Sequence, residues 1–247
     1  MKLQFVKTSN YQRVMAGLAA VENRGSAEAC ILLLTGEPGT GKSRTIDHIG
    51  SYRNALYLEG VPGMNLSYVR DFLAEETGVS GSGRYQQFTN LTDHLETTRQ
   101  PIIFDEAQHG LPNKAECIEY LRRVAEKAEV VLVLVCHTSE RQRFSSDKLA
   151  HIYTRIASLV ELKKASLDDC GLYLRELCEV GVDEGVIAKA FEDSGGRYRL
   201  LANACKTLEA IAGKLGKAGL TQEDIKNIRL CEDAMKTIRG GKKGGSE

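Results

Sequence analysis

The chain has 247 residues, of which 42% are hydrophobic, so it is long enough for one large domain or for a core domain with a small second one. Its 33 Lys and Arg residues balance 33 Asp and Glu residues, and this neutrality argues against a protein that wraps DNA tightly on a basic surface. The seven cysteines lack Cys-x-x-Cys spacing, which favours buried free thiols over a metal site or a disulfide framework.

Apolar runs alternate with helical patterns along the first two thirds of the chain. Apolar residues at helical spacing predict helices over 10–22, 43–52, 65–77, 88–98 and 114–127. Continuous apolar runs predict strands over 30–34, 55–58, 101–105, 130–136 and 159–162. Because apolar strands of this kind alternate with helices, the pattern predicts an α/β fold with a parallel sheet covered on both faces.

The strand signals stop after Leu162. Helices are expected over 167–180, 183–193 and 197–215. A last helix is expected from Thr221 onward, with an inward face made by Ile225, Ile228, Met235 and Ile238. We therefore expect an α/β domain over 1–164, a small helical domain over 165–239 and a disordered basic tail over 240–247.

A glycine-rich segment follows the first predicted strand and precedes a helix. It fits G-x-x-x-x-G-K-[ST] without a mismatch, through Gly36, Glu37, Pro38, Gly39, Thr40, Gly41, Lys42 and Ser43. Glycines in such a loop let backbone N–H groups point at phosphate oxygens, and the helix adds its positive end. The pattern predicts that ATP binds here, with Lys42 on the β- and γ-phosphates and Ser43 on Mg²⁺.

Two acidic residues end the third predicted strand. Asp105 is expected to hold Mg²⁺ through water, and the adjacent Glu106 to orient and polarise the attacking water as a general base. A pair of acids at a strand end is a weak signal alone. The glycine-rich loop upstream makes it the second half of a predicted ATPase site.

Three further positions carry polar groups that can act on a γ-phosphate. The fourth predicted strand ends at His137 and Thr138, either of which could sense that phosphate. Arg155 precedes the fifth strand, and Arg199 starts a helix of the second domain. Either guanidinium could neutralise charge on the γ-phosphate, although a surface salt bridge is the common outcome for such residues.

Together these motifs resemble the AAA+ ATPases in their order along the chain. The match comprises the P-loop, Asp105 with Glu106, a sensor at Thr138, an arginine finger at Arg155 and a second sensor at Arg199. The resemblance implies a P-loop NTPase sheet of order 5-1-4-3-2 with a small C-terminal helical lid. It also implies a homo-oligomer, in which the finger of one subunit faces the ATP of its neighbour.

Residues 133–140 and 195–200 resemble the transposition branch of these ATPases, the group of MuB-, TnsC- and TniB-like target-DNA activators. In the first segment His137 and Ser139 replace a glycine and a proline of that branch. The branch implies a ring or helical filament that binds double-stranded DNA without sequence preference and delivers it to a transposase. It implies hydrolysis of ATP that DNA and the partner protein stimulate.

Two alternatives within the AAA+ ATPases stay open: a helicase loader of the DnaC/IstB type, and a secretion or regulatory ATPase that binds no DNA. A small-molecule kinase is more distant, because Glu106 suits water better than an acceptor hydroxyl. No apolar run reaches the length of a membrane span, so we expect no membrane partner and a cytoplasmic location, in the host cell if a phage encodes the protein.

The resemblance also suggests where DNA would lie. Loops after the second strand line a central channel in the resembled assemblies, and the corresponding residues here are Asn65, Ser67 and Arg70. Arg84, in the glycine-rich stretch further on, is a second candidate. Such groups can hold phosphates without reading bases. The competing interpretation is that they are ordinary exposed polar side chains.

Overall fold

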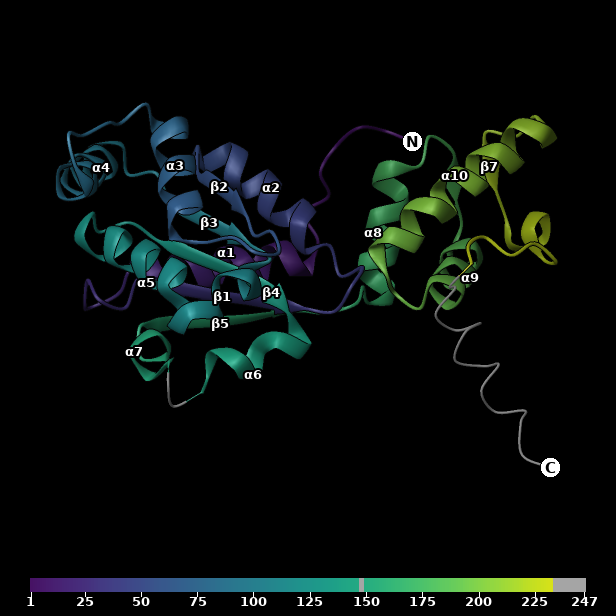
Figure 1. Cartoon of the computed structure of the whole chain (residues 1–247). Coiled ribbons are helices and arrows are strands. Elements are labelled where there is room, and N and C mark those ends of the chain that lie inside the picture. The colour runs from purple at the N-terminus through teal and green to yellow at the C-terminus, as the bar shows by residue number, and fades with distance from the viewer. Residues whose placement is uncertain (147–148, 233–247) are drawn as a thin grey trace. The chain divides into compact units, whose positions relative to one another are not determined.

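The computed structural model describes residues 1–146 and 149–232 of the chain. The chain divides into two compact units (Figure 1). One unit consists of Asn10–Glu37 and Lys42–Leu162 and contains the sheet. The other consists of Met1–Ser9, Pro38–Gly41 and the chain from Lys163 onward, and is mainly helical.

A five-stranded parallel sheet forms the centre of the α/β unit. Its strands are β1 (Ile31–Gly36), β2 (Leu56–Glu59), β3 (Ile102–Asp105), β4 (Leu132–His137) and β5 (Ile156–Leu162). Their spatial order is β2-β3-β4-β1-β5, and each neighbouring pair is parallel. The predicted order 5-1-4-3-2 is therefore confirmed. β5 begins three residues before the predicted 159, because Ile156 already pairs with Ile31 although Ala157 and Leu159 are exposed.

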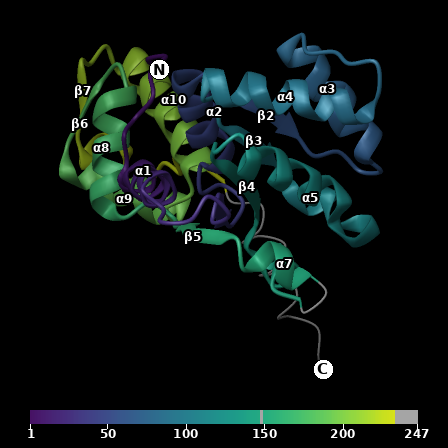
Figure 2. The same cartoon turned by 90° about the vertical axis from the view of Figure 1, so that its left-hand side faces the viewer.

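The helices of this unit connect the strands. They are α1 (Ser9–Glu22), α2 (Lys42–Arg53), α3 (Leu66–Thr77), α4 (Arg84–Thr98), α5 (Pro112–Lys127), α6 (Arg141–Phe144) and α7 (Ala150–Tyr153). Two 3₁₀ turns, η1 (Ala107–Gly110) and η2 (Thr138–Glu140), follow β3 and β4. Figures 1 and 2 show α3 and α4 side by side. The helix predicted over 88–98 starts four residues earlier, at Arg84, because its first turn is polar and exposed and carries no apolar period.

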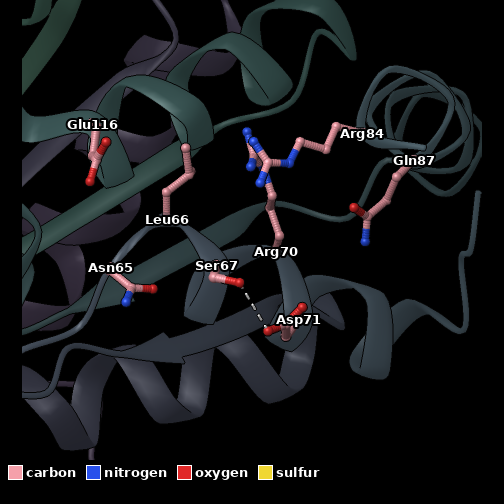
Figure 3. A pocket seen from close by; sticks show the side chains of 8 residues that line it. All are labelled: Asn65, Leu66, Ser67, Arg70, Asp71, Arg84, Gln87 and Glu116. Carbon is pink, nitrogen blue, oxygen red and sulfur yellow. Dashed lines mark hydrogen bonds between the residues drawn. The ribbon is translucent and has the colours of Figure 1, made fainter.

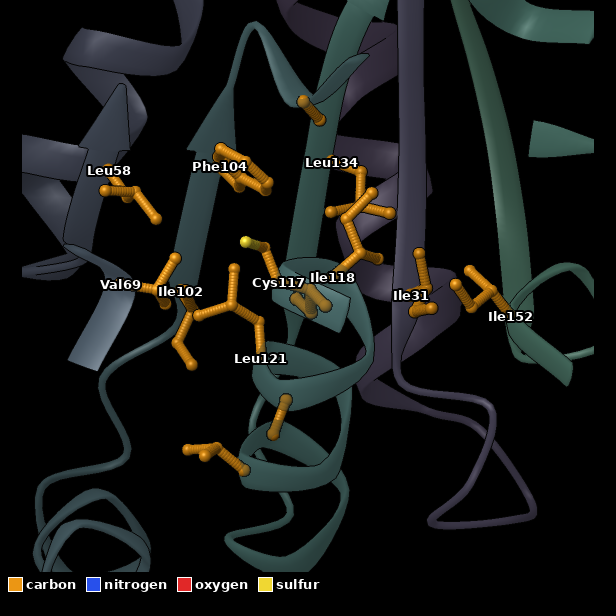
Figure 4. Close-up of a cluster of buried hydrophobic side chains, with 14 of the residues drawn as sticks. Ile31, Leu58, Val69, Ile102, Phe104, Cys117, Ile118, Leu121, Leu134 and Ile152 are labelled. Atoms are coloured by element: carbon orange, nitrogen blue, oxygen red, sulfur yellow. The ribbon is translucent and has the colours of Figure 1, made fainter. Parts of the chain in front are cut away.

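Side chains alternate between the two faces of the sheet, so each strand supplies two separate cores. On one face, residues of β1, β3 and β4 pack with α3, α5 and α7 (Figure 4); the cluster includes Ile31, Ile102, Phe104, Leu134, Val69, Ile118, Leu121 and Ile152. On the other face, Leu32, Leu34 and Ile103 pack with residues of α1 and α2. Both faces are covered, as the apolar strands predicted, and the polar carboxyl ends of the strands lie at the edge of this core.

The second unit packs α8 (Leu167–Leu177), α9 (Glu184–Ser194) and α10 (Tyr198–Leu215) around its own apolar core. Ser166 caps α8 by accepting a hydrogen bond from the N–H of Asp169 at 3.1 Å. The prediction that no strand follows Leu162 is wrong. β6 (Gly181–Val182) and β7 (Gly219–Leu220) form a parallel pair, which is too short and too rich in glycine to leave an apolar run.

The segment after β7 also differs from the predicted helix. Thr221 and Asp224 form a reciprocal capping box, but the element they cap is a 3₁₀ turn, η4 (Gln222–Ile225). Ile225 is buried, whereas Ile228 is exposed. Met235, Ile238 and the expected tail over 240–247 lie outside the described residues.

The cysteines agree with the prediction from their apolar surroundings: all seven are buried, and none of them forms a disulfide within the described residues. Burial raises the pKa of Cys30 to about 11 and that of Cys136 to about 12. Among the residues described, no helix is both long enough and apolar enough to cross a membrane.

Candidate functional site

The predicted phosphate-binding loop leaves β1 at Gly36 and enters α2 at Lys42. Gly39 and Gly41 have φ angles of 83° and 85°, in the left-handed region where a side chain is strained. Thr40 between them is buried, and Ser43 is exposed in the first turn of α2. The loop therefore depends on glycine at Gly41, which the sequence pattern requires, and at Gly39, which stands at one of its variable positions.

Lys42 lies folded over its own loop. Its Nζ donates hydrogen bonds to the backbone oxygens of Gly36, at 2.7 Å, and Glu37, at 3.2 Å. An ammonium group can rotate its three N–H donors among acceptors. The side chain is thus held at the loop by bonds to neutral carbonyls, which phosphate oxygens could replace with stronger, charge-assisted ones.

Asp105 ends β3 as a buried carboxylate, with 4% of its surface exposed. Its Oδ1 accepts the N–H of Glu106 and its Oδ2 accepts the hydroxyl of Tyr57, both at 2.8 Å. Burial, together with the negative charge of Asp105, raises the pKa of Tyr57. The Tyr57 hydroxyl consequently stays protonated and remains a donor to this carboxylate.

Glu106 has an unusual backbone. Its φ of 49° and ψ of 41° place it in the left-handed region, which residues with a side chain adopt infrequently. The N–H of Gly60 donates to the carbonyl oxygen of Asp105 at 2.8 Å. A Cβ on Gly60 would lie 2.4 Å from the carbonyl oxygen of Glu106, so only glycine fits beside this strand end.

Gln108 completes this strand end. Its Nε2 donates to a carboxylate oxygen of Glu106, while its Oε1 is buried and has no hydrogen-bond partner in the described part of the chain. The predicted site residues did not include Gln108, Tyr57 or Gly60. The signals available were weak: a tyrosine in an apolar strand, whose hydroxyl needs a partner, and a glutamine two residues after Glu106.

The two candidate sensors at the end of β4 differ. His137 is engaged locally, because its Nδ1 lies 2.7 Å from the hydroxyl of Ser139 and 3.2 Å from the backbone N of the same residue. Thr138 opens η2, and its buried Oγ1 has no hydrogen-bond partner within residues 1–146 and 149–232. A buried hydroxyl is normally completed by water or a ligand. Thr138 is therefore the better placed of the two to receive one.

The two predicted arginines belong to different compact units. Arg155 lies directly before β5, as expected, and its guanidinium pairs with the Glu28 carboxylate at 2.9 Å. The Nε atom of Arg155 is buried, without a partner among the described residues. Arg199 is exposed in the first turn of α10.

The four predicted DNA contacts share one cavity of about 360 Å³ between α3, α4 and α5 (Figure 3). The cavity is lined by Asn65, Leu66, Ser67, Arg70, Asp71, Arg84, Gln87 and Glu116. The expectation that loops carry these groups is wrong, because Ser67 and Arg70 lie on α3 and Arg84 is the first residue of α4. Ser67 and Arg70 fall inside the helix predicted over 65–77, whereas Arg84 lies before the helix predicted over 88–98.

Several lining side chains already have structural partners. Asn65 caps α3 by accepting the N–H of Tyr68 at 3.0 Å, and Ser67 bonds Asp71 at 3.4 Å. The guanidinium of Arg70 lies 5.1 Å from the ring centre of Tyr120, within range of a cation–π contact. Arg70 and Arg84 point toward one another in Figure 3. Asp71 and Glu116 line the same cavity, so its arginines and carboxylates are equal in number.

Comparison with known proteins extends this description. Residues 26–144 match a family model described as an AAA domain. Cdc6p from Pyrobaculum aerophilum has a similar structure, with a TM-score of 0.61, 18% identity, and 87% of this chain and 64% of that chain covered. The Aeropyrum pernix ORC2 protein, in complexes with ADPNP and ADP, has a similar structure with a TM-score of 0.59 and 18% identity. The match covers 87% of this chain and 63% of that chain. For a RuvB mutant of Thermotoga maritima the TM-score is 0.61 and the identity 16%. The match covers 98% of this chain and 79% of that chain.

These identities are low, so the likeness concerns the fold. This chain spans slightly less than two thirds of the Cdc6p and ORC2 chains that it matches. No curated protein matches it in sequence. The chain has the α/β P-loop NTPase fold of the AAA+ ATPases, and residues 26–144 within it match an AAA domain.

Proposed function

We propose that this chain binds and hydrolyses ATP at the carboxyl edge of its sheet. The observation that carries the proposal is the glycine-dependent loop between β1 and α2, at the same sheet edge as the buried carboxylate of Asp105. Parallel α/β sheets bind their ligands at this edge. The nucleotides held by the similar ORC2 structure, ADPNP and ADP, are consistent with that choice.

The side chains at the edge fit a magnesium–nucleotide. Ser43 offers an exposed hydroxyl and Asp105 a carboxylate, and oxygen ligands of this kind suit Mg²⁺. The buried Thr138 hydroxyl, which has no partner among the described residues, is a group that a ligand would complete. Bound Mg²⁺ would neutralise charge on the phosphate oxygens.

Each residue then has a separate task. Lys42 binds the β- and γ-phosphates in exchange for its bonds to Gly36 and Glu37. Glu106 orients the attacking water and accepts its proton, and Thr138 bonds the γ-phosphate. Arg155 from a neighbouring subunit and Arg199 stabilise charge on the transferring group.

We propose further that ATP controls binding of double-stranded DNA, without sequence preference, by a homo-oligomeric ring or filament. The cavity between α3, α4 and α5, called here the α3–α4 cavity, supports DNA binding. It brings Arg70 and Arg84 together with Asn65 and Ser67, whose polar side chains can bond phosphates. The motif order and the segments 133–140 and 195–200 support delivery of that DNA to a transposase in the cytoplasm, with hydrolysis stimulated by both partners.

One observation favours the alternative of an ATPase that binds no DNA. Asp71 and Glu116 line the same cavity as the two arginines, and the chain as a whole is neutral. Carboxylates repel DNA phosphates and would weaken non-specific binding. A helicase loader remains the alternative in which DNA is bound but the partner belongs to replication.

Phosphate release and electron microscopy together test the proposal. The wild-type protein is incubated with ATP and Mg²⁺, with and without double-stranded DNA, and the DNA is imaged with ATP, with ADP and without nucleotide. The proposal predicts that the protein releases phosphate from ATP. It also predicts that ordered assemblies form on DNA with ATP and do not form with ADP or without nucleotide. Phosphate release with no assembly on DNA under any condition would favour the ATPase without DNA.

A further inference from the structure

Tyr57 reaches across the boundary between two strands to Asp105. In the register of β2 and β3, Tyr57 stands opposite Ile103, and Glu59 stands opposite Asp105. Tyr57 is therefore two residues, or about 6.6 Å, before the level of Asp105 along the strand. The length of its side chain covers this offset, and the hydroxyl lies 2.8 Å from Oδ2. Side chains two residues apart on a strand share a face, so the bond lies on the face covered by α1 and α2.

The hydrogen bond from Tyr57 engages one oxygen of the Asp105 carboxylate, and the other oxygen is hydrogen-bonded as well. Oδ1 of Asp105 accepts the N–H of Glu106 and Oδ2 accepts the Tyr57 hydroxyl, so the two bonds together restrict rotation of the carboxyl group. Each carboxylate oxygen has a second lone pair, which leaves it able to accept a further hydrogen bond from water. Burial, the charge of Asp105 and the nearby Asp47 raise the pKa of Tyr57, so the hydroxyl keeps the proton that it donates here.

We infer that Tyr57 is a positioning residue that orients the carboxylate of Asp105 toward a hydrated magnesium–nucleotide, an inference that rests on the proposed function. The physical reason is that a carboxylate free to rotate must be ordered when the cation binds, whereas a carboxylate already fixed by Tyr57 need not be. Groups that orient a metal-binding side chain in this way typically contribute about 10- to 100-fold to metal affinity.

Replacing Tyr57 with Phe removes the hydroxyl and keeps the ring that packs against α2. Binding of ADPNP is measured by calorimetry at a series of Mg²⁺ concentrations and in EDTA. The matched control is Tyr52→Phe, which removes an exposed hydroxyl from α2. We expect Tyr57→Phe to raise the Mg²⁺ concentration for half-maximal enhancement of ADPNP binding by about 10-fold or more. The affinity in EDTA should stay within about 2-fold of wild type, since Lys42 and the loop are intact, and Tyr52→Phe should match wild type throughout.

Each outcome decides the matter. An unchanged Mg²⁺ dependence in Tyr57→Phe, with wild-type affinity in EDTA, overturns the inference and leaves the proposed function standing. An equal loss in EDTA and in Mg²⁺ also overturns it, because Tyr57 would then support the loop rather than the carboxylate. A wild-type protein that binds no ADPNP at all contradicts the proposed function itself.

Discussion

The carboxyl edge of the sheet and the α3–α4 cavity offer polar groups to a ligand in different ways. At the sheet edge the geometry is set by backbone: Gly39 and Gly41 have left-handed angles, and Gly60 lies against the carbonyl oxygen of Glu106. In the cavity the polar groups are side chains of α3, α4 and α5 and of Asn65, which precedes α3. Several of these side chains cap, bond or stack within the chain. The sheet edge holds the buried carboxylate of Asp105, and it also holds the buried Thr138 hydroxyl, which has no partner among the described residues. The cavity instead contains two arginines and two carboxylates.

This difference shows what a built site requires. A buried polar group without a partner reduces stability unless water or a ligand completes it, and the Thr138 hydroxyl at the sheet edge is one such group. Exposed side chains that already stabilise the fold need no ligand to account for them. We therefore expect substitutions at the sheet edge to affect ATP chemistry strongly, and substitutions in the cavity to affect DNA binding moderately or stability alone.

The largest expected effect comes from Arg155→Ala. If this guanidinium reaches the ATP of a neighbouring subunit, its loss should slow hydrolysis in the assembled protein by about 1,000-fold. Phosphate release is measured with assembly monitored in the same samples. Mixing Arg155→Ala with Lys42→Ala should restore some hydrolysis, because Lys42→Ala subunits supply an intact Arg155 to the intact P-loops of Arg155→Ala neighbours.

The ion pair with Glu28 provides the control for this prediction. Glu28→Gln removes the carboxylate partner of Arg155 and leaves the guanidinium in place. Hydrolysis close to wild type in Glu28→Gln, with a large loss in Arg155→Ala, fits a finger that acts in trans. Equal losses in both variants, or co-assembled mixtures with no activity beyond the sum of their parts, would show that Arg155 acts through its local pair.

Glu106→Gln should slow hydrolysis by about 100-fold or more and leave ATP binding intact. The amide keeps the shape of the side chain and loses the oxygen that accepts a proton from water. Single-turnover hydrolysis and calorimetric binding separate the two effects. Any assembly on DNA should persist longer in this variant, since the ATP state is prolonged; unchanged turnover would remove Glu106 from the mechanism.

The features that the sequence predicts are those with a local signal in it, and the features that it does not predict depend on how separate elements pack. The apolar run of β4 and the glycine pattern at Gly36 are local signals, and the strand and the strand–loop–helix they predict are confirmed. The strand order, which the resemblance to the AAA+ ATPases implied, is confirmed as well. The bond from Tyr57 to Asp105 depends on the register of β2 against β3, which no local pattern encodes. The meeting of Arg70 and Arg84 depends likewise on the packing of α3 and α4, and the two-residue strands β6 and β7 are too short to leave a period.

Arg84→Ala tests whether the cavity contacts DNA. Arg84 is exposed, and the slope of log affinity against log salt concentration should fall by about one when its phosphate contact is lost. Fluorescence anisotropy of labelled duplexes at several salt concentrations measures that slope. The control is Arg99→Ala, an exposed arginine at the other end of α4. An identical slope for Arg84→Ala, Arg99→Ala and wild type would leave the cavity without a role in DNA binding.

The smallest expected effect concerns Asn65, which caps α3. Asn65→Ala should lower the free energy of unfolding by about 1 kcal/mol, because the N–H of Tyr68 loses its partner. Asn65→Ser keeps a capping oxygen and should stay close to wild type in stability while losing the amide. Urea unfolding measures stability, and anisotropy measures DNA affinity in the same variants. A loss of DNA affinity in both variants, without a loss of stability in Asn65→Ser, would make the amide a DNA contact.

The central claim is that the loop from Gly36 to Ser43 binds the phosphates of ATP, and the most direct test is calorimetric titration of ADPNP with Mg²⁺ into wild type and Lys42→Ala. Removing the ammonium that bonds Gly36 and Glu37 should lower the affinity by at least about 100-fold, beyond detection. Lys114→Ala, which truncates an exposed lysine of α5, should bind like wild type. Wild-type affinity in Lys42→Ala would contradict the claim and place the nucleotide elsewhere.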